Sequence, residues 1–543
     1  MRIARVTRPV LAALAVTAVA VVGTTVAVVA TTNASAGTVL LPAGTASDAA
    51  LVATLDQLLA GSRLAGSTVG MQVRDGATGE VIYSHSADQR VIPASNEKLM
   101  TSVAALEVLG TGYKFHTVAA YSGTKSSKTV SGNLYLRGQG DPTMTYAEFD
   151  ALATAVAKAG ITKFSGGLVA DDSWFDHVPL GLDWSWQDEG YADNAAISAL
   201  TVAADANFDT GSVAVQSKPG AAVGNAAVLT LTPANSVVKI VNHAVTGAAG
   251  SANTVTASRA HGTNTVTVSG SSPLKATTPG NVLVSVQDPT QLAVGVFRDA
   301  LKRHGVTVVG STTTGTTPSG TKTIVDHASM PLSQLLPYFL KLSNNGHAEL
   351  LTKAMGRAKS PTSAGSWSTG LAAGTTALKG IGVDTSVIKM GDGSGLSRRD
   401  WLTTGQIATL LSAAQTRPWF ATWFAALPIA GDPNPLIGGT LASRMRGTPA
   451  AGNLHGKTGT LSGVNALSGY VNDLSGRRLV FAGISNSALS NVSDILDSAA
   501  VAMASSGGAA TTALSPQRLA KVTPHVVTRN GEDVECSWVP NGC

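Results

Sequence analysis

The feature that most narrows the possible folds of this chain is a long stretch with no large aromatic side chain. Between Asp209 and Val296 there is no Phe, Tyr or Trp, and short runs such as "SVAVQSK", "AVLTLT" and "NTVTVSG" alternate with Gly, Ser and Asn. Such runs between turn residues predict a small all-β module. Longer helical and sheet patterns flank it, so we expect the chain to leave one domain and return to it later.

The segments around this module predict mixed α/β structure. Before it, Thr68–Arg74 and Val81–His85 form a predicted hairpin, and a helix follows Pro93. After it, the pattern predicts a helix from Pro289 to Gly305 and further helices between Ala348 and Gln415. The last clear pair of strands lies in "LSGVNALSGYVND" and "RRLVFAGISNS".

The N-terminus predicts export. Three arginines precede an apolar run from Val10 to Ala30, and Ala34-Ser35-Ala36 has the small-x-small form of a cleavage site. We expect residues 1–36 to be a signal peptide, and the mature chain to reside in the extracellular, cell-wall or periplasmic space without a stable membrane span. The apolar run is also long enough for an uncleaved anchor, which is the alternative.

Composition excludes several classes of protein. With 44% hydrophobic and 13% charged residues the chain is globular, and its net charge of +5 over 543 residues comes without the dense Lys/Arg run that nucleic-acid binding requires. The two cysteines, Cys536 and Cys543, are predicted to form a disulfide in an oxidising compartment, with free thiols as the alternative.

The helix predicted from Pro93 to Gly110 opens with an unusual pair of side chains. Ser95 stands near its N-terminus, and Lys98 stands where a capping box would place Glu or Gln and where the helix dipole disfavours a cation. The plain interpretation is a capping serine and a solvated lysine. The chemical interpretation is a serine whose proton passes to a lysine of lowered pKa, because residues at i and i+3 share a helix face.

Two further motifs favour the chemical interpretation. Ser343-Asn344-Asn345 follows an amphipathic helix, and Lys457-Thr458-Gly459-Thr460 enters a predicted strand. Penicillin-recognising serine enzymes carry the set S-x-x-K, S-x-N and K-T-G. Each motif alone is common, but all three in this order and in fitting contexts are hard to obtain by chance.

With these motifs the chain resembles the class C low-molecular-mass penicillin-binding proteins, which are D-alanyl-D-alanine carboxypeptidases and also endopeptidases. The resemblance runs from about Ser47 to about Ser505 and includes "GQGDPTMT", "DDSWFD", "GDGSGLSRRD" and "LPIAG". The interval between Ser95 and Ser343 is far longer than a β-lactamase needs, and the family fills it with two inserted domains, one nested in the other.

The resemblance implies an α/β (α+β) transpeptidase-like domain, a sheet flanked by helices, with two nested and largely β insertions. The expected parts are a catalytic domain of residues 37–120 and 331–515, an inserted domain of residues 121–208 and 285–330, a nested β domain of residues 209–284, and a C-terminal tail of residues 516–543.

The chemistry then assigns roles in catalysis. Ser95 Oγ is the expected nucleophile and Lys98 the general base. Ser343 relays a proton to the leaving D-alanine, and Asn345 binds the substrate's peptide carbonyl and helps to position Lys98.

Substrate binding falls to the third motif. Lys457 and the hydroxyls of Thr458 and Thr460 are expected to bind the terminal carboxylate, with Gly459 between them. Lys457 would also lower the pKa of Lys98 by like-charge repulsion. The backbone N–H groups of Ser95 and Thr460 would form the oxyanion hole.

Four further residues have competing interpretations. By resemblance, Asp141 and Arg398 bind the free amino end of a stem peptide, but Asp141-Pro142 is also an ordinary turn and Arg398 an ordinary surface residue. His347 and Glu349 form only a lone H-x-E, so we expect no metal and no other cofactor.

We therefore predict a serine-type D-alanyl-D-alanine carboxypeptidase that also acts as an endopeptidase on peptidoglycan stem peptides and is acylated by β-lactams. The alternatives are a β-lactamase-like hydrolase or esterase of the same superfamily, and a non-catalytic wall-binding protein.

Overall fold

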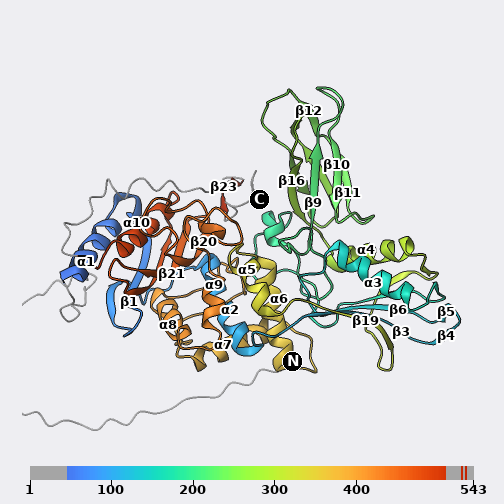
Figure 1. The fold of residues 1–543 in the computed structure, drawn as a ribbon, viewed down its shortest axis with the longest axis horizontal. Helices are drawn as coiled ribbons and strands as arrows, with labels where there is room; N and C mark the ends of the chain where they lie inside the picture. The colour runs from blue at the N-terminus through green and yellow to red at the C-terminus, as the bar shows by residue number, and fades with distance from the viewer. Residues whose placement is uncertain (1–45, 509–526, 530–531, 535–543) are drawn as a thin grey trace, which may run out of the picture. The chain divides into compact units, whose positions relative to one another are not determined.

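The computed structural model describes residues 46–508, 527–529 and 532–534. Its central element is an antiparallel five-stranded sheet in the order β2-β1-β22-β21-β20 (Figure 1). The strands are β1 (Thr68–Asp75), β2 (Val81–His85), β20 (His455–Leu461), β21 (Val464–Asn472) and β22 (Arg478–Asn486). The predicted hairpin of β1 and β2 and the late strand pair are confirmed.

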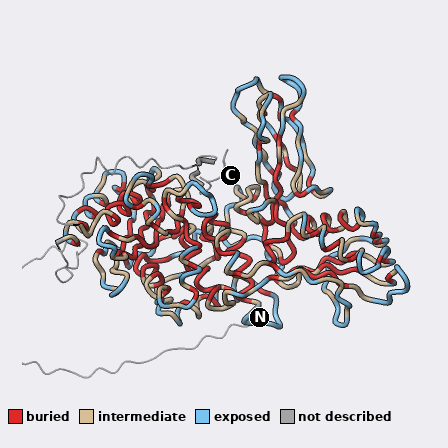
Figure 2. The backbone as a smooth tube through the Cα atoms, viewed as in Figure 1, coloured by how far each residue is buried: buried red, intermediate tan, exposed pale blue. Residues whose placement is uncertain are grey.

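Helices cover both faces of this sheet because its side chains alternate between two apolar cores. In β22, Leu479 and Phe481 join the core under α1 (Ala46–Leu59) and α10 (Ser493–Ala504). Val480, Ala482 and Ile484 point to the opposite core. That core is built from α2 (Glu97–Val108), α5 (Leu332–Leu340), α6 (Asn345–Lys359), α7 (Trp367–Gly380), α8 (Thr404–Ala414) and α9 (Phe420–Ala425). Figure 2 shows both cores as buried chain.

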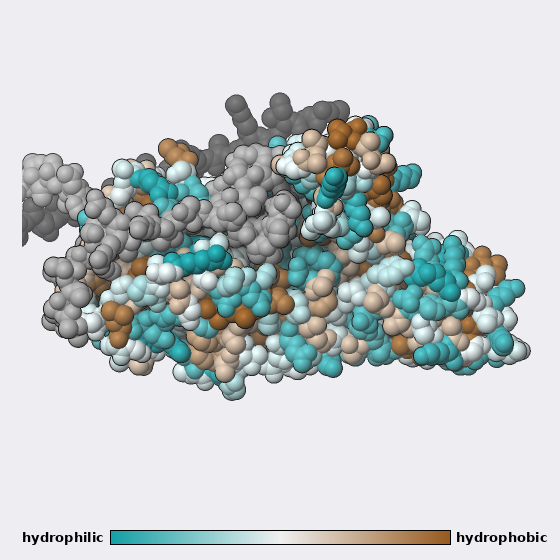
Figure 3. Space-filling model, turned by 45° about the horizontal axis from the view of Figure 1, so that its top comes forward, coloured by the Kyte–Doolittle hydropathy of each residue, from teal (hydrophilic) through white to brown (hydrophobic). Residues whose placement is uncertain are grey.

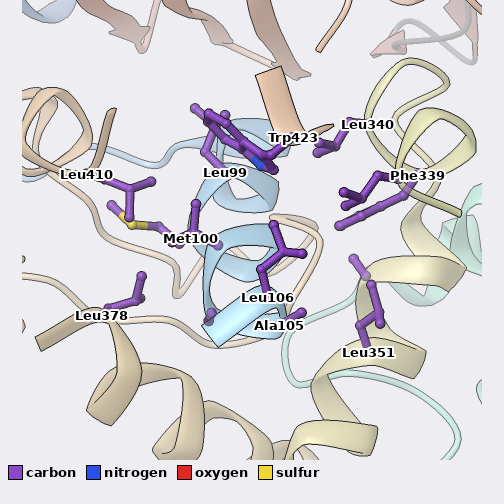
Figure 4. Packing of buried hydrophobic residues seen from close by; sticks show 14 of the residues in the cluster. Leu99, Met100, Ala105, Leu106, Phe339, Leu340, Leu351, Leu378, Leu410 and Trp423 are labelled. Atoms are coloured by element: carbon purple, nitrogen blue, oxygen red, sulfur yellow. The ribbon is translucent and has the colours of Figure 1, made fainter. Parts of the chain in front are cut away.

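Helix α2 lies in the middle of the second core. Every residue from Glu97 to Leu106 is buried. Figure 4 shows Leu99, Met100 and Leu106 of α2 surrounded by side chains such as Trp423 and Leu351 from other helices. Burial of each large aliphatic side chain stabilises the fold by roughly 1.5–3 kcal/mol. The N-terminus of α2 is therefore held rigidly.

The region between α2 and α5 has a sheet of its own, whose first and last strands in sequence are neighbours. β3 (His116–Tyr121) pairs antiparallel with β19 (Lys322–Ala328) in a sheet of order β18-β8-β6-β3-β19. Its other strands are β6 (Leu134–Gly138), β8 (Leu168–Asp171) and β18 (Thr312–Thr314), and α3 (Tyr146–Lys158) and α4 (Pro289–Arg303) pack in the same apolar core. Because β3 and β19 pair with each other, the chain enters and leaves this sheet at adjacent strands.

A smaller sheet, β17-β7-β5-β4, belongs to the same region. Its strands are β4 (Thr124–Ser126), β5 (Thr129–Ser131), β7 (Lys163–Phe164) and β17 (Thr307–Val308).

Residues 212–285 of the aromatic-free segment form only strands and the turns between them, as the sequence predicts, and α4 begins after them at Pro289. The sheets of this segment have the orders β10-β9-β16, β11-β14-β13 and β12-β15. The strands are β9 (Ser212–Lys218), β10 (Val228–Thr232), β11 (Lys239–Asn242), β12 (Val245–Gly247), β13 (Thr256–Arg259), β14 (Thr265–Ser269), β15 (Ser271–Pro273) and β16 (Gly280–Ser285). Because the segment has no aromatic side chains, its interior is filled by smaller apolar residues, among them Val213, Val215, Val266 and Val268.

Polar and apolar residues are interspersed over the face shown in Figure 3. Within the described ranges, none of the helices combines the length and the apolar character that crossing a bilayer requires. In the tail, β23 (Val527–Arg529) pairs with β24 (Glu532–Val534). The predicted signal peptide and both cysteines, Cys536 and Cys543, lie outside the described residues.

Candidate active site

Ser95 lies in a tight turn that leads into α2. Residues Ala94–Asn96 form a 3-10 turn, and α2 continues from Glu97. No side chain caps either element, so Ser95 is not an N-cap. Ala94 has a positive φ of 48°, a left-handed conformation that costs energy for a residue with a Cβ and is common at functional sites.

Lys98 is a completely buried lysine beside Ser95. Its Nζ atom lies 2.9 Å from Ser95 Oγ, 2.6 Å from Asn345 Oδ1 and 2.8 Å from the Ser394 carbonyl oxygen. The solvated-lysine interpretation is therefore wrong.

These partners fit both charge states of Lys98. An ammonium can donate to all three oxygens, whereas a neutral lysine has two N–H donors and one lone pair. Asn345 Oδ1 and the Ser394 carbonyl can only accept hydrogen bonds, while the Ser95 hydroxyl can accept or donate. In its neutral form, Lys98 can donate to the first two and turn its lone pair to the Ser95 proton, which is the geometry of a general base beside a nucleophile.

A second lysine–serine pair comes from the other two motifs. Lys457 is also fully buried, and its Nζ atom donates to Ser343 Oγ over 2.8 Å and to the Thr458 carbonyl over 2.8 Å. Ser343 has a φ of 55° and precedes α6, whose N-cap is Asn344. The structure thus brings the three motifs together as two hydrogen-bonded lysine–serine pairs.

Strand β20 lies directly against the turn that carries Ser95. Asn96 Nδ2 donates to the Lys457 carbonyl over 3.0 Å. A Cβ atom at Gly459 would lie 2.8 Å from the Pro93 carbonyl oxygen and 3.1 Å from the backbone nitrogen of Asn96. Only glycine permits this close approach of the two backbones, which places β20 against the turn that carries Ser95.

The two threonines of β20 differ in their surroundings. Thr458 is buried, and its hydroxyl donates to Thr440 Oγ1 over 2.7 Å. Thr460 is half-buried. The hydroxyl of Thr460 is therefore the more accessible of the two for a ligand.

Arg398 and Asp141 occupy different environments. Arg398 is exposed and donates at 3.3 to 3.4 Å to the carbonyl of Ser462, in the turn after β20. Asp141 is 1% exposed and accepts hydrogen bonds from the backbone and hydroxyl of Thr143, with His327 3.4 Å away. Oδ1 therefore has the contacts of a turn carboxylate, whereas Oδ2 is buried and accepts no hydrogen bond from the described residues, so these contacts are compatible with both interpretations of Asp141.

His347 and Glu349 are buried and have structural partners. His347 Nε2 lies 2.9 Å from the Phe208 carbonyl, and burial lowers the pKa of His347 to about 4. Glu349 accepts from Trp367 Nε1 and the Gly393 backbone, and burial raises the pKa of Glu349 to about 7. In the part of the chain that the structure describes, no group of three or more His, Cys, Asp or Glu side chains is arranged to hold a metal ion.

Some members of the site could not be found from the motifs. The Ser394 carbonyl on Lys98 belongs to "GDGSGLS", and the Asp193 carbonyl accepts a 2.9 Å hydrogen bond from Asn345 Nδ2. Both are backbone carbonyls, so the residue types at these positions do not indicate that they belong to the site. Thr440 was also missed, although "GGTLAS" lies only a short way before the third motif.

Comparisons with known proteins agree with this geometry. The sequence profile of the D-Ala-D-Ala carboxypeptidase 3 (S13) family matches residues 51–505. A D-alanyl-D-alanine carboxypeptidase of Actinomadura sp. (strain R39) is 43% identical over 489 residues, which cover 89% of each chain. The D-alanyl-D-alanine carboxypeptidase DacB of Haemophilus influenzae is 26% identical over 77% of this chain and 85% of its own.

A solved structure supports the fold. The crystal structure of penicillin binding protein 4 (dacB) from Haemophilus influenzae superposes with a TM-score of 0.69 at 22% identity, over 83% of this chain and 97% of that one. The same protein complexed with a β-lactam superposes with a TM-score of 0.65.

Proposed function

Because this chain belongs to the D-Ala-D-Ala carboxypeptidase 3 (S13) family and is a D-alanyl-D-alanine carboxypeptidase, we propose that it hydrolyses its substrate through an acyl-enzyme on Ser95. The observation that carries the proposal is the 2.9 Å contact between Ser95 Oγ and the buried Lys98 Nζ. A hydroxyl is a weak nucleophile until an adjacent base takes its proton.

In acylation, Lys98 Nζ takes the Ser95 proton as Oγ attacks the carbonyl carbon of the penultimate D-alanine. The backbone N–H groups of Ser95 and Thr460 stabilise the resulting oxyanion, and one such donor typically contributes on the order of 3 kcal/mol. The carbon–nitrogen bond then breaks, and the proton that Lys98 took from Ser95 passes through Ser343 to the leaving amine, which returns Lys98 to its neutral form. Lys457 holds Ser343 at 2.8 Å.

In deacylation, a water molecule gives its proton to Lys98 and attacks the ester carbonyl. Ser95 Oγ leaves and recovers its proton from Lys98. In both halves of the reaction, the 2.6 Å hydrogen bond from Lys98 Nζ to Asn345 Oδ1 keeps the amine oriented toward Ser95.

We propose that the substrate's terminal carboxylate binds at β20. Lys457 supplies positive charge there, and the Thr460 hydroxyl is its accessible donor, with Thr458 behind it. Arg398, next to the turn after β20, extends the positive rim toward the rest of the substrate.

Peptidoglycan stem peptides and their cross-links are the proposed substrates, which makes the enzyme both a carboxypeptidase and an endopeptidase. β-Lactams are the proposed covalent inhibitors, because their strained amide presents an equivalent carbonyl to Ser95. The Arg-flanked apolar N-terminus supports a proposed location outside the cytoplasm, where peptidoglycan lies.

Release of D-alanine from a synthetic peptide ending in D-Ala-D-Ala tests the mechanism. The wild-type chain should release one D-alanine per peptide, and Ser95→Ala should reduce release to background while its melting temperature stays near wild type. Release by a folded Ser95→Ala variant would refute the proposed acyl-enzyme.

A further inference from the structure

The Ser394 carbonyl that binds Lys98 lies on a loop with no helix or strand of its own. Residues 391–397, here called the Ser394 loop, consist of bends and turns. At Gly395, with a φ of 89°, a Cβ would lie 1.9 Å from the Ala94 carbonyl oxygen, so the loop is pressed against the turn that carries Ser95. Because the loop has no regular secondary structure, other contacts must fix it for the Ser394 carbonyl to keep its hydrogen bond with Lys98.

One buried carboxylate fixes the Ser394 loop from inside. Asp392 Oδ1 accepts hydrogen bonds from the backbone N–H groups of Ser394 and Gly395, at 3.0 and 2.7 Å, and Asp392 Oδ2 accepts from that of Ser397 at 2.7 Å. Asp392 is completely buried. Three N–H groups therefore converge on Asp392 while the Ser394 carbonyl faces Lys98.

The inserted region supplies a further donor to the same carboxylate. Trp184 Nε1 donates to Asp392 Oδ2 over 2.8 Å. The indole ring of Trp184 packs edge-on against that of Trp367, with centroids 5.9 Å apart. Next to it, Asp183 forms an ion pair with Arg399. The segment around Trp184 is thus attached to Asp392 within the Ser394 loop and to Arg399, two residues after the loop.

The same segment also holds the other accepting partner of Lys98. Asn345, whose Oδ1 accepts from Lys98, donates through Nδ2 to the Asp193 carbonyl over 2.9 Å. Residues 184–193 therefore contact the supports of both oxygens that accept a hydrogen bond from Lys98. Trp184 binds Asp392, which holds the Ser394 loop, and the Asp193 carbonyl binds Asn345.

We propose that Trp184 is a positioning residue for catalysis, which keeps the Ser394 carbonyl on Lys98 by hydrogen-bonding Asp392 and so makes the general base depend on the inserted region. The proposal rests on the proposed role of Lys98. Trp184 does not touch the reacting atoms, and its effect passes through Asp392 and the Ser394 loop.

The test is Trp184→Phe in the full chain, with Trp186→Phe as the matched control. Phenylalanine keeps an aromatic ring against Trp367 but has no N–H for Asp392. Trp186 lies in the same segment, is 69% exposed and has its ring near His261. The measured quantities are the acylation rate with a fluorescent penicillin, kcat and KM with a D-Ala-D-Ala peptide, and the melting temperature.

Trp184→Phe is expected to lower the acylation rate and kcat about tenfold, which corresponds to one hydrogen bond of ordinary strength, with KM nearly unchanged. Trp186→Phe should stay within about twofold of wild type. Acylation by Trp184→Phe at the wild-type rate would overturn the proposal.

Trp184→His separates the lost donor from the lost ring volume, because its smaller ring keeps an N–H. Trp184→His should recover part of the rate that Trp184→Phe loses. Equal loss in both variants, together with equal loss of stability, would show that Trp184 only packs. If instead the wild-type chain is not acylated at Ser95, the proposed function fails first.

Discussion

Lys98 Nζ donates a 2.6 Å hydrogen bond to Asn345 Oδ1 across a sequence separation of 247 residues. The inserted region lies between them in sequence, and its Asp193 carbonyl binds the other end of the Asn345 amide. The amide is therefore fixed in one orientation, with its oxygen toward the lysine and its NH₂ toward the insertion. A base held in this way needs little reorganisation as it takes the proton of Ser95.

Asn345→Ala tests this relationship. The variant removes the hydrogen bonds of Asn345 to Lys98 and to the Asp193 carbonyl, so Lys98 is no longer held in its orientation toward Ser95. We expect kcat/KM for a D-Ala-D-Ala peptide to fall about a hundredfold, the typical effect of misplacing a catalytic group. Steady-state kinetics and a melting curve would measure it, and kcat/KM near wild type in a folded variant would contradict the orientation role.

Gly395→Ala tests the packing of the Ser394 loop on the Ser95 turn. An added Cβ would lie 1.9 Å from the Ala94 carbonyl oxygen, so the loop must move away from Lys98. Penicillin acylation should fall by more than about a hundredfold. Gly382→Ala is the control, since Gly382 also has a positive φ, 97°, but no atom within 4 Å of the added Cβ.

The control should cost about 1 kcal/mol of stability through backbone strain alone and leave acylation unchanged. Similar acylation rates for the two glycine variants would show that the Ser394 loop tolerates displacement.

Thr458 and Thr460 should differ when each is changed to Val. Thr460 is the accessible hydroxyl, so Thr460→Val should raise KM for peptides with a free C-terminal carboxylate about tenfold or more, the loss of one hydrogen bond to a charged group. Thr458→Val removes a buried hydrogen bond to Thr440 and should chiefly lower the melting temperature. A larger KM effect at Thr458 would mean that its hydroxyl turns toward the substrate.

Asp141 should make stability depend on pH. Burial raises the pKa of Asp141 to about 6, above its usual value in an unfolded chain. Its stabilising contribution is therefore complete below about pH 4 and is lost as the pH rises through about 6, by up to about 3 kcal/mol. Asp141→Asn keeps an oxygen for Thr143 and removes this titration.

The melting temperature of Asp141→Asn should thus rise relative to wild type between pH 4 and pH 7, and a constant difference would contradict the buried titration. Because Asp141 Oδ1 makes the turn contacts and Oδ2 accepts no hydrogen bond, the same variant tests the proposed substrate pocket. A carboxylate that binds the free amino end of a stem peptide predicts that Asp141→Asn loses about tenfold or more in kcat/KM with the amine-bearing peptide alone. An unchanged ratio between peptides with and without the amino group would contradict that role.

The contact between Ser95 and Lys98 could be predicted because it depends on side-chain type at local spacing. Ser95 and Lys98 are three residues apart on one helix face, and such a pair can be inferred without a fold. The aromatic-free stretch likewise predicts strands, since only small β-branched side chains are available to fill its core.

The remainder of the site depends on tertiary contacts. The carbonyls of Ser394 and Asp193 become partners of the site only once a loop and an inserted segment have folded against α2 and α6. The same applies to Asp141, because the burial of "GDPT" and its contacts with Thr143 and His327 depend on the folded chain.

The measurement that tests the central claim most directly is the site of covalent labelling by a fluorescent penicillin, identified by mass spectrometry of the digested protein. The expected result is one label per chain, on the peptide that contains Ser95, and no label on a Ser95→Ala variant with a wild-type melting temperature. Label on any other residue, or label that persists in Ser95→Ala, would contradict the assignment of Ser95 as the nucleophile and Lys98 as its base.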